Sequence, residues 1–151
     1  MRYGRSSGFT LIELVVVLFV LALAVTVVVP ALGRGLDSVR TRVEVAGVAR
    51  FLRAAREQAI TRGEVYEVRV DLAARALMLV AGGERKTVRA SRRLSTGFEI
   101  ASDVRGATAV AFSPQGLSSG GRFSIHAPGG RAYIVSVDPL TGRVSSRLAG
   151  Q

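Results

Sequence analysis

The sequence predicts an α+β protein in which a long N-terminal helix packs on an antiparallel β-sheet domain. Three observations carry this prediction: an apolar run over residues 9–32, a helical spacing of apolar residues over 36–60, and short alternating segments after Gly63. Spacings of three and four residues are typical of an amphipathic helix, and strict alternation is typical of a half-buried strand. We therefore divide the chain into a leader (1–8), a transmembrane helix (9–32), its amphipathic continuation (33–62) and a β-rich domain (63–151).

The apolar run over residues 9–32 is long enough to cross a lipid bilayer. Its 24 residues give roughly 36 Å of helix at about 1.5 Å per residue, against a hydrocarbon core of about 30 Å. A cleaved secretory signal is the alternative, because Ala22-Leu23-Ala24 has the small-x-small shape of a signal peptidase site. Against this alternative, the apolar run continues past Ala24 and Glu13 interrupts the segment. We expect a single spanning anchor.

Glu13 is the only charged residue between Arg5 and Arg34. A carboxylate at hydrocarbon depth costs about 2.5 to 3.5 kcal/mol on insertion scales, so we expect a compensating interaction. If the chain is cut after Gly8, the new amino group of Phe9 lies one helical turn from Glu13 and neutralises it. On this hypothesis Glu13 is an assembly residue, and the alternative is a carboxylate that only reaches toward the head groups.

Pro30 lies near the end of the apolar run. Proline lacks an amide donor and crowds the preceding turn, so it predicts a kink or a local loosening of the helix; a simple helix stop is the alternative. Helical spacing resumes after Gly35 and continues to about Arg62, where Gly63 is a C-terminal stop signal. Clean heptads are too few to favour a coiled coil.

The continuation of the helix is expected to pack on the β-rich domain through its apolar positions. These are Leu36, Val39, Val43, Ala46, Ala49, Phe51, Leu52, Ala55, Ala59 and Ile60. Charged residues are expected at the remaining positions, namely Arg42, Glu44, Arg50, Arg53, Arg56 and Glu57.

The pattern changes to a period of two at Val65, where Tyr66, Val68 and Val70 alternate with polar residues. Further strands are expected over residues 76–80, 84–90, 98–101, 109–113, 122–126, 131–137 and 143–148. A long helix followed by many short strands gives the α+β class with antiparallel sheets.

Composition argues against catalysis and metal binding. The chain contains no cysteine and one histidine, His126, so thiolate sites and clustered histidine ligands cannot be assembled. We expect no enzymatic activity, no cofactor and no metal, and we expect His126 to be a polar residue at a strand end. The formal charge is +10, and without residues 1–8 the chain keeps 19 basic against 11 acidic residues, a formal +8. Such a surplus favours anionic partners without choosing among them.

The densest basic segment lies over residues 84–93. Its cationic side chains are Arg85, Lys86, Arg89, Arg92 and Arg93. We expect a solvated loop or an edge strand whose charges discourage sheet-to-sheet aggregation. The functional alternative is docking to an acidic partner or to DNA, although few aromatic residues interleave the arginines.

The N-terminal motif resembles that of type IV prepilins and type II secretion pseudopilins. A basic leader ends in Gly8, Phe9 to Glu13 follow, and a long apolar helix is interrupted at Pro30. The resemblance implies cleavage between Gly8 and Phe9 by a prepilin peptidase, N-methylation of Phe9, and a single-pass anchor in the bacterial inner membrane with the C-terminal domain in the periplasm.

The C-terminal half is similar to the H-type minor pseudopilins of type II secretion and their FimT-like relatives in type IV pilus systems. The matching residues are 109–116, Gly120-Gly121, 132–137 and 141–144. The resemblance implies a minor pseudopilin that assembles with other pseudopilins; the alternative is a FimT-like minor pilin active in pilus assembly or DNA uptake. Some relatives contribute to DNA uptake through a C-terminal arginine motif, but residues 142–147 space their bases more widely, which counts against nucleic-acid binding.

Overall fold

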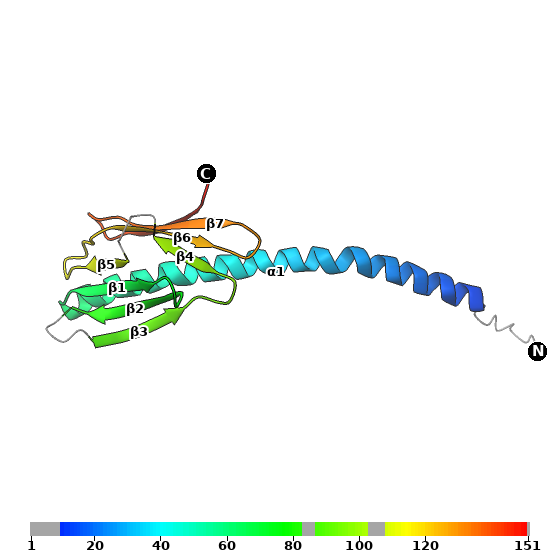
Figure 1. Ribbon diagram of the computed structural model, residues 1–151, viewed down its shortest axis with the longest axis horizontal. Coiled ribbons are helices and arrows are strands. Elements are labelled where there is room, and N and C mark those ends of the chain that lie inside the picture. The colour runs from blue at the N-terminus through cyan, green and yellow to red at the C-terminus, as the bar shows by residue number, and fades with distance from the viewer. Residues whose placement is uncertain (1–9, 83–86, 103–107, 151) are drawn as a thin grey trace, which may run out of the picture. The chain divides into compact units, whose positions relative to one another are not determined.

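The computed structural model describes residues 10–82, 87–102 and 108–150, with the side chains of 27–36 left aside. The chain forms two compact units, Met1–Val39 and Arg40–Gln151. Helix α1 is followed by eight strands in the described residues (Figure 1). Their bounds are α1 Leu11–Arg62, β1 Tyr66–Asp71, β2 Ala76–Ala81, β3 Thr87–Arg93, β4 Glu99–Ser102, β5 Ala109–Phe112, β6 Gly121–His126, β7 Ala132–Val137 and β8 Val144–Leu148.

Helix α1 spans 52 residues and ends where the sequence predicts. Gly63 follows its last residue with a φ of 67°, a left-handed conformation that glycine adopts without a Cβ penalty. The predicted end at Arg62 is therefore confirmed. The helix also continues through Pro30, so this residue is not a helix stop, and the kink expected there stays a prediction.

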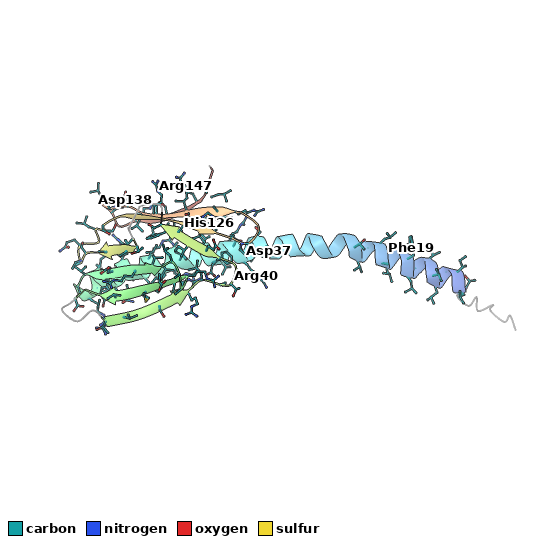
Figure 2. All side chains as sticks on the ribbon, in the orientation of Figure 1. Phe19, Asp37, Arg40, His126, Asp138 and Arg147 are labelled. Atoms are coloured by element: carbon teal, nitrogen blue, oxygen red, sulfur yellow. The ribbon has the colours of Figure 1, made fainter. Side chains whose placement is uncertain are left out.

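Apolar side chains surround the first turns of α1 in the N-terminal unit. Leu11 is 82% exposed and Phe19 is 64% exposed, and Figure 2 shows side chains projecting from this stretch in every direction. In the part of the chain whose residues are described, no helix is both long and apolar enough to span a membrane. The anchor over residues 9–32 stays a prediction.

The strands form two four-stranded antiparallel sheets. The strand order is β3-β2-β1-β5 in the first sheet and β4-β6-β7-β8 in the second. In β1, Tyr66, Val68 and Val70 are buried and the residues between them are half-buried, which confirms the alternation read from the sequence. Val68 lies opposite Leu79 of β2 and Val110 of β5, so one face of the first sheet is continuous and apolar.

One hydrophobic core joins α1 and both sheets in the unit Arg40–Gln151. The second half of α1 lies alongside both sheets (Figure 1). The helix contributes a stripe of fully buried residues at spacings of three and four, and fully burying a leucine such as Leu52 stabilises the fold by about 1.5 to 3 kcal/mol. The largest fully buried side chains are Phe112, Phe123, Leu52, Leu77, Leu79 and Ile125.

The packing face of α1 differs from the expected one. Val39, Val43 and Ile60 are 59%, 63% and 44% exposed, whereas Thr41 and Glu44 are buried. The expectation was wrong for these positions because two neighbouring stripes of the helix both carry apolar residues at helical spacing. Which stripe faces the core is decided by how the sheets pack against the helix.

Strand β3 lies further along the chain than expected. The sequence favoured residues 84–90, part of which falls outside the described residues, and the strand runs over Thr87–Arg93. Its pairing with β2 shifts between Leu79 and Val80, where a bulge inserts an extra residue. Three basic residues of the segment, Arg89, Arg92 and Arg93, lie on this strand, whose register with β2 no local pattern reveals.

Candidate functional site

The N-terminal assembly motif is described from Thr10 onward, and Gly8 and Phe9 lie outside the described residues. Thr10 caps α1: its Oγ1 accepts a hydrogen bond from the N–H of Glu13 at 3.3 Å, and its carbonyl accepts one from Leu14 at 3.2 Å. Glu13 is thus the third helical residue, where a carboxylate interacts favourably with the helix dipole. The Thr-x-x-Glu spacing typical of a capping box is the sequence signal for this helix cap, which was not among the expectations drawn from the sequence.

The basic segment does not present its charges on one face. Arg85 and Lys86 lie outside the described residues. Arg93 is exposed, Arg92 turns toward α1, and Arg89 lines a hollow beside Glu57 near the end of the helix. Binding of an anionic partner by this segment stays a prediction.

Glu44 forms the centre of a buried polar cluster. Its Oε2 lies 3.3 Å from Nη2 of Arg92, and its two oxygens accept hydrogen bonds from the N–H and the hydroxyl of Ser95 at 3.2 and 3.1 Å. Gly47 makes room for Arg92, since a Cβ there would lie 2.9 Å from Nη1 and closer to other guanidinium atoms. This cluster fastens β3 and the following loop to the helix. The expectation that Glu44 faces solvent is wrong, and its partners could not be foreseen because they lie about fifty residues away in sequence.

Arg56 and Arg53 fasten two further segments to α1. Its Nε donates a hydrogen bond to the carbonyl of Gly116 at 3.0 Å, and a Cβ at Gly142 would lie 2.7 Å from the same nitrogen. One helical turn earlier, Nη2 of Arg53 donates to the carbonyl of Val144 at 3.2 Å. The glycines in 109–116 and 141–144 thus allow both loops to approach the guanidinium group of Arg56.

The loop between β7 and β8 is held by Asp138, labelled in Figure 2. Its Oδ1 accepts hydrogen bonds from the N–H of Thr141 at 2.8 Å, the hydroxyl of Thr141 at 2.9 Å and the N–H of Leu140 at 3.0 Å. The bonds from the backbone and then the hydroxyl of Thr141 lower the pKa of Asp138 below its ordinary value. Ser118 donates its hydroxyl to the carbonyl of Asp138 at 2.9 Å, which ties the β5–β6 loop to this one.

His126 is the last residue of β6 and is exposed, as expected for a polar residue at a strand end. It lies opposite Ala132 of β7 and Glu99 of β4 (Figure 2). Within the described parts of the chain, no group of three histidine, aspartate or glutamate side chains is placed to hold a metal ion.

An N-terminal helix that begins in a capped apolar stretch and ends buried against antiparallel sheets defines a pilin-like protein. The prokaryotic N-terminal methylation motif matches residues 4–29. The family described as type II transport protein GspH matches residues 44–141. The chain belongs to the GspH family.

Solved structures share this fold. The minor pseudopilin EpsH of the type II secretion system of Vibrio cholerae is 16% identical, with a TM-score of 0.62 over 73% of this chain and 98% of that chain. The type IV minor pilin FimU of Pseudomonas aeruginosa is 14% identical, with a TM-score of 0.57 over 70% and 91%. A comparison with curated proteins gave no match. The predicted α+β, pilin-like fold is confirmed.

The family match also supports the predicted function. The match to the GspH family identifies a minor pseudopilin of type II secretion, and the alternative of a FimT-like minor pilin is less well supported. The EpsH and FimU structures agree with this assignment in fold. Pseudopilins and pilins are structural proteins, in keeping with the expectation of a protein without enzymatic activity. Family membership implies assembly with other pilin-like subunits, and the methylation motif implies processing by a prepilin peptidase.

Proposed function

We propose that this chain is made as a prepilin and becomes a subunit of the periplasmic pseudopilus of a type II secretion machine. A prepilin peptidase cuts between Gly8 and Phe9 and methylates the new amino group. Residues 9–32 anchor the protein in the inner membrane, and the β-rich domain stands in the periplasm. The match of the GspH family over residues 44–141, behind a methylation motif over 4–29, is the observation that carries this proposal.

Glu13 sets the position of the subunit along the pseudopilus. Its neighbours in α1 are apolar and exposed, and no cation of the described residues pairs with it. In a bundle of such helices the dielectric constant falls, so an unpaired carboxylate becomes costly and pairing with an ammonium group becomes favourable. The amino terminus of Phe9, in the same or a neighbouring subunit, supplies that partner. Pairing favours one axial register of the helices.

Two substitutions at Glu13 separate its charge from its place in the helix cap. Glu13→Gln keeps the size of the side chain and the hydrogen bond from the backbone N–H of residue 13 to Thr10, but removes the charge. We expect Glu13→Gln and Glu13→Ala to be inserted and cleaved normally, and to enter pseudopili at least about tenfold less than wild type. The amount of the chain in sheared filaments, relative to membrane-bound chain, measures this. Wild-type incorporation of Glu13→Gln would refute the role of the charge.

The processing step is tested at Gly8. Glycine lets the chain leave helical geometry and lets the peptidase approach the backbone, so a branched side chain obstructs cleavage. We expect Gly8→Val to retain its leader, with Gly8→Ala as the milder companion variant. Mass spectrometry of the purified chain gives the N-terminal residue. Normal processing of both variants would contradict the proposed cleavage, whatever the outcome at Glu13.

A further inference from the structure

An open groove of about 950 Å³ lies between the last turns of α1 and the loop that joins β7 to β8. It belongs to the unit Arg40–Gln151 and lies at the C-terminal end of the helix. Three arginines line it, Arg53 and Arg56 from the helix and Arg143 from the loop, together with one acidic residue, Glu57. The rest of the lining consists of Ile60, Thr61, Thr141, Gly142 and Val144.

The two helix arginines of the groove are held in place by hydrogen bonds but are not neutralised. Arg53 and Arg56 each donate one hydrogen bond to a backbone carbonyl, at 3.2 and 3.0 Å. A guanidinium group has five N–H donors, so most remain available to a ligand. Over residues 10–82, 87–102 and 108–150, no carboxylate lies within ion-pair distance of Arg53, Arg56 or Arg143. Three positive charges, two of them held by hydrogen bonds, against one negative charge make the groove attractive to anions.

An exposed apolar side chain, Ile60, stands beside the charges. Ile60 is 44% exposed, and its Cδ1 lies close to Gly116, next to Arg56. Leu117 follows Gly116 and is 47% exposed, and Leu140 precedes the groove-lining Thr141 and is 79% exposed. Single exposed leucines are ordinary on protein surfaces, but an exposed isoleucine in the lining of a positively charged groove matches a ligand that is both apolar and acidic.

A protein segment fits this chemistry better than a nucleic acid does. A nucleic-acid backbone needs a track of cations along regularly spaced phosphates, and it has no use for aliphatic side chains. Glu57 repels phosphates and carboxylates alike, so the exposed aliphatic side chain of Ile60 in the lining is what favours a protein segment. A second copy of this chain is disfavoured by its net charge of +10.

We propose that this groove binds an acidic segment of a partner protein. Carboxylates of the partner pair with Arg53 and Arg143, and an apolar side chain of the partner packs beside Ile60. Planar guanidinium groups suit carboxylates because they donate two parallel hydrogen bonds. This role goes beyond the assembly function of Glu13 and uses neither the leader nor the processed N-terminus.

Fluorescence anisotropy of labelled probes with the full-length chain in detergent tests the proposal. The probes are the peptide Glu-Glu-Leu-Glu-Glu-Leu, its Gln-for-Glu counterpart, and a deoxythymidine oligomer of about 12 nucleotides. The double variant Arg53→Gln/Arg143→Gln is compared with Arg93→Gln/Arg131→Gln. The control removes the same charge from two exposed arginines that do not line the groove. Arg93 is the last residue of β3, and Arg131 directly precedes β7.

We expect the groove variant to raise the Kd of the acidic peptide at least about tenfold and the control variant to change it less than about threefold. If both variants raised the Kd of the peptide equally, the binding would depend only on the net charge of the chain, and the proposal would be overturned. If the groove variant weakened the binding of the deoxythymidine oligomer and left that of the peptide unchanged, the groove would be a nucleic-acid site, and the proposal would also be overturned. If the double variant does not fold, two single variants replace it. Arg143→Gln must then raise the Kd of the acidic peptide and Glu57→Gln must lower it, and failure of either refutes the proposal.

Discussion

Replacing Arg92 by alanine tests the buried polar cluster around Glu44. In the wild-type chain Arg92 lies 3.3 Å from a carboxylate whose side chain is only 8% exposed. Arg92→Ala leaves this carboxylate with the two hydrogen bonds from Ser95, at 3.2 and 3.1 Å. A buried carboxylate that loses its cation destabilises the folded state, because water is not available to replace the lost interaction.

The magnitude follows from the exposure of the two partners. Breaking a fully buried ion pair costs about 3 to 5 kcal/mol, and exposed pairs are worth less than about 1 kcal/mol. Arg92 is 31% exposed, so water reaches part of the space it vacates. We expect the free energy of unfolding to fall by about 2 kcal/mol, which lowers the midpoint of thermal unfolding by about 8 °C for a unit of this size.

Arg93→Ala is the matched control, since Arg93 is the next residue and is exposed. Surface substitutions of this kind stay within about 0.5 kcal/mol. Denaturant unfolding of the full-length chain in detergent measures both variants, and a double-mutant cycle with Glu44→Gln isolates the interaction between Glu44 and Arg92. A loss for Arg92→Ala no larger than for Arg93→Ala would refute the reasoning.

Two further predictions concern the loop between β7 and β8. Gly142→Ala should destabilise the chain by about 2 to 4 kcal/mol, because φ is 62° there and a Cβ would meet the carbonyl of Gly116 and lie 2.7 Å from Nε of Arg56. Gly63→Ala, at φ 67° with no atom within 4 Å, should lose only about 1 kcal/mol in unfolding experiments, and equal losses would contradict the steric argument. The pKa of Asp138 is lowered by its bonds to Thr141, so its contribution is present above the unfolded-state pKa and is lost as pH falls through the folded-state value. Stability should therefore drop more between about pH 5 and pH 3 in wild type than in Asp138→Asn, and superimposable profiles from thermal unfolding would contradict this.

Much of the fold and the family was predictable because the signals are local. Gly63 ends the helix, and the alternation of Tyr66, Val68 and Val70 identifies β1. The N-terminal motif that contains Glu13 is local too, and it indicates the class of protein without knowledge of the fold. Boundaries were less accurate where pairing decides them, as in β3, whose bulge opposite Leu79 and Val80 has no local signature.

The candidate sites within the β-rich unit were not predictable, because their residues are distant in sequence. Glu44 looks like a solvent-facing helix residue until Arg92 and Ser95 are brought against it by the first sheet. Arg53 and Arg56 likewise look like ordinary surface arginines of a helix. Their role emerges when the loops at Gly116 and Val144 fold onto the helix.

By itself the amino-acid sequence determined where the helix ends, which segments alternate as strands, and that an acidic residue stands in an apolar N-terminal run. These properties depend on neighbours within a few residues along the chain. Only the tertiary structure decided which stripe of α1 is buried and which charges are paired, and it alone revealed the groove that gathers Arg53, Arg56 and Arg143. Burial and ion pairing depend on the arrangement of two sheets around one helix, and no local sequence pattern specifies that arrangement.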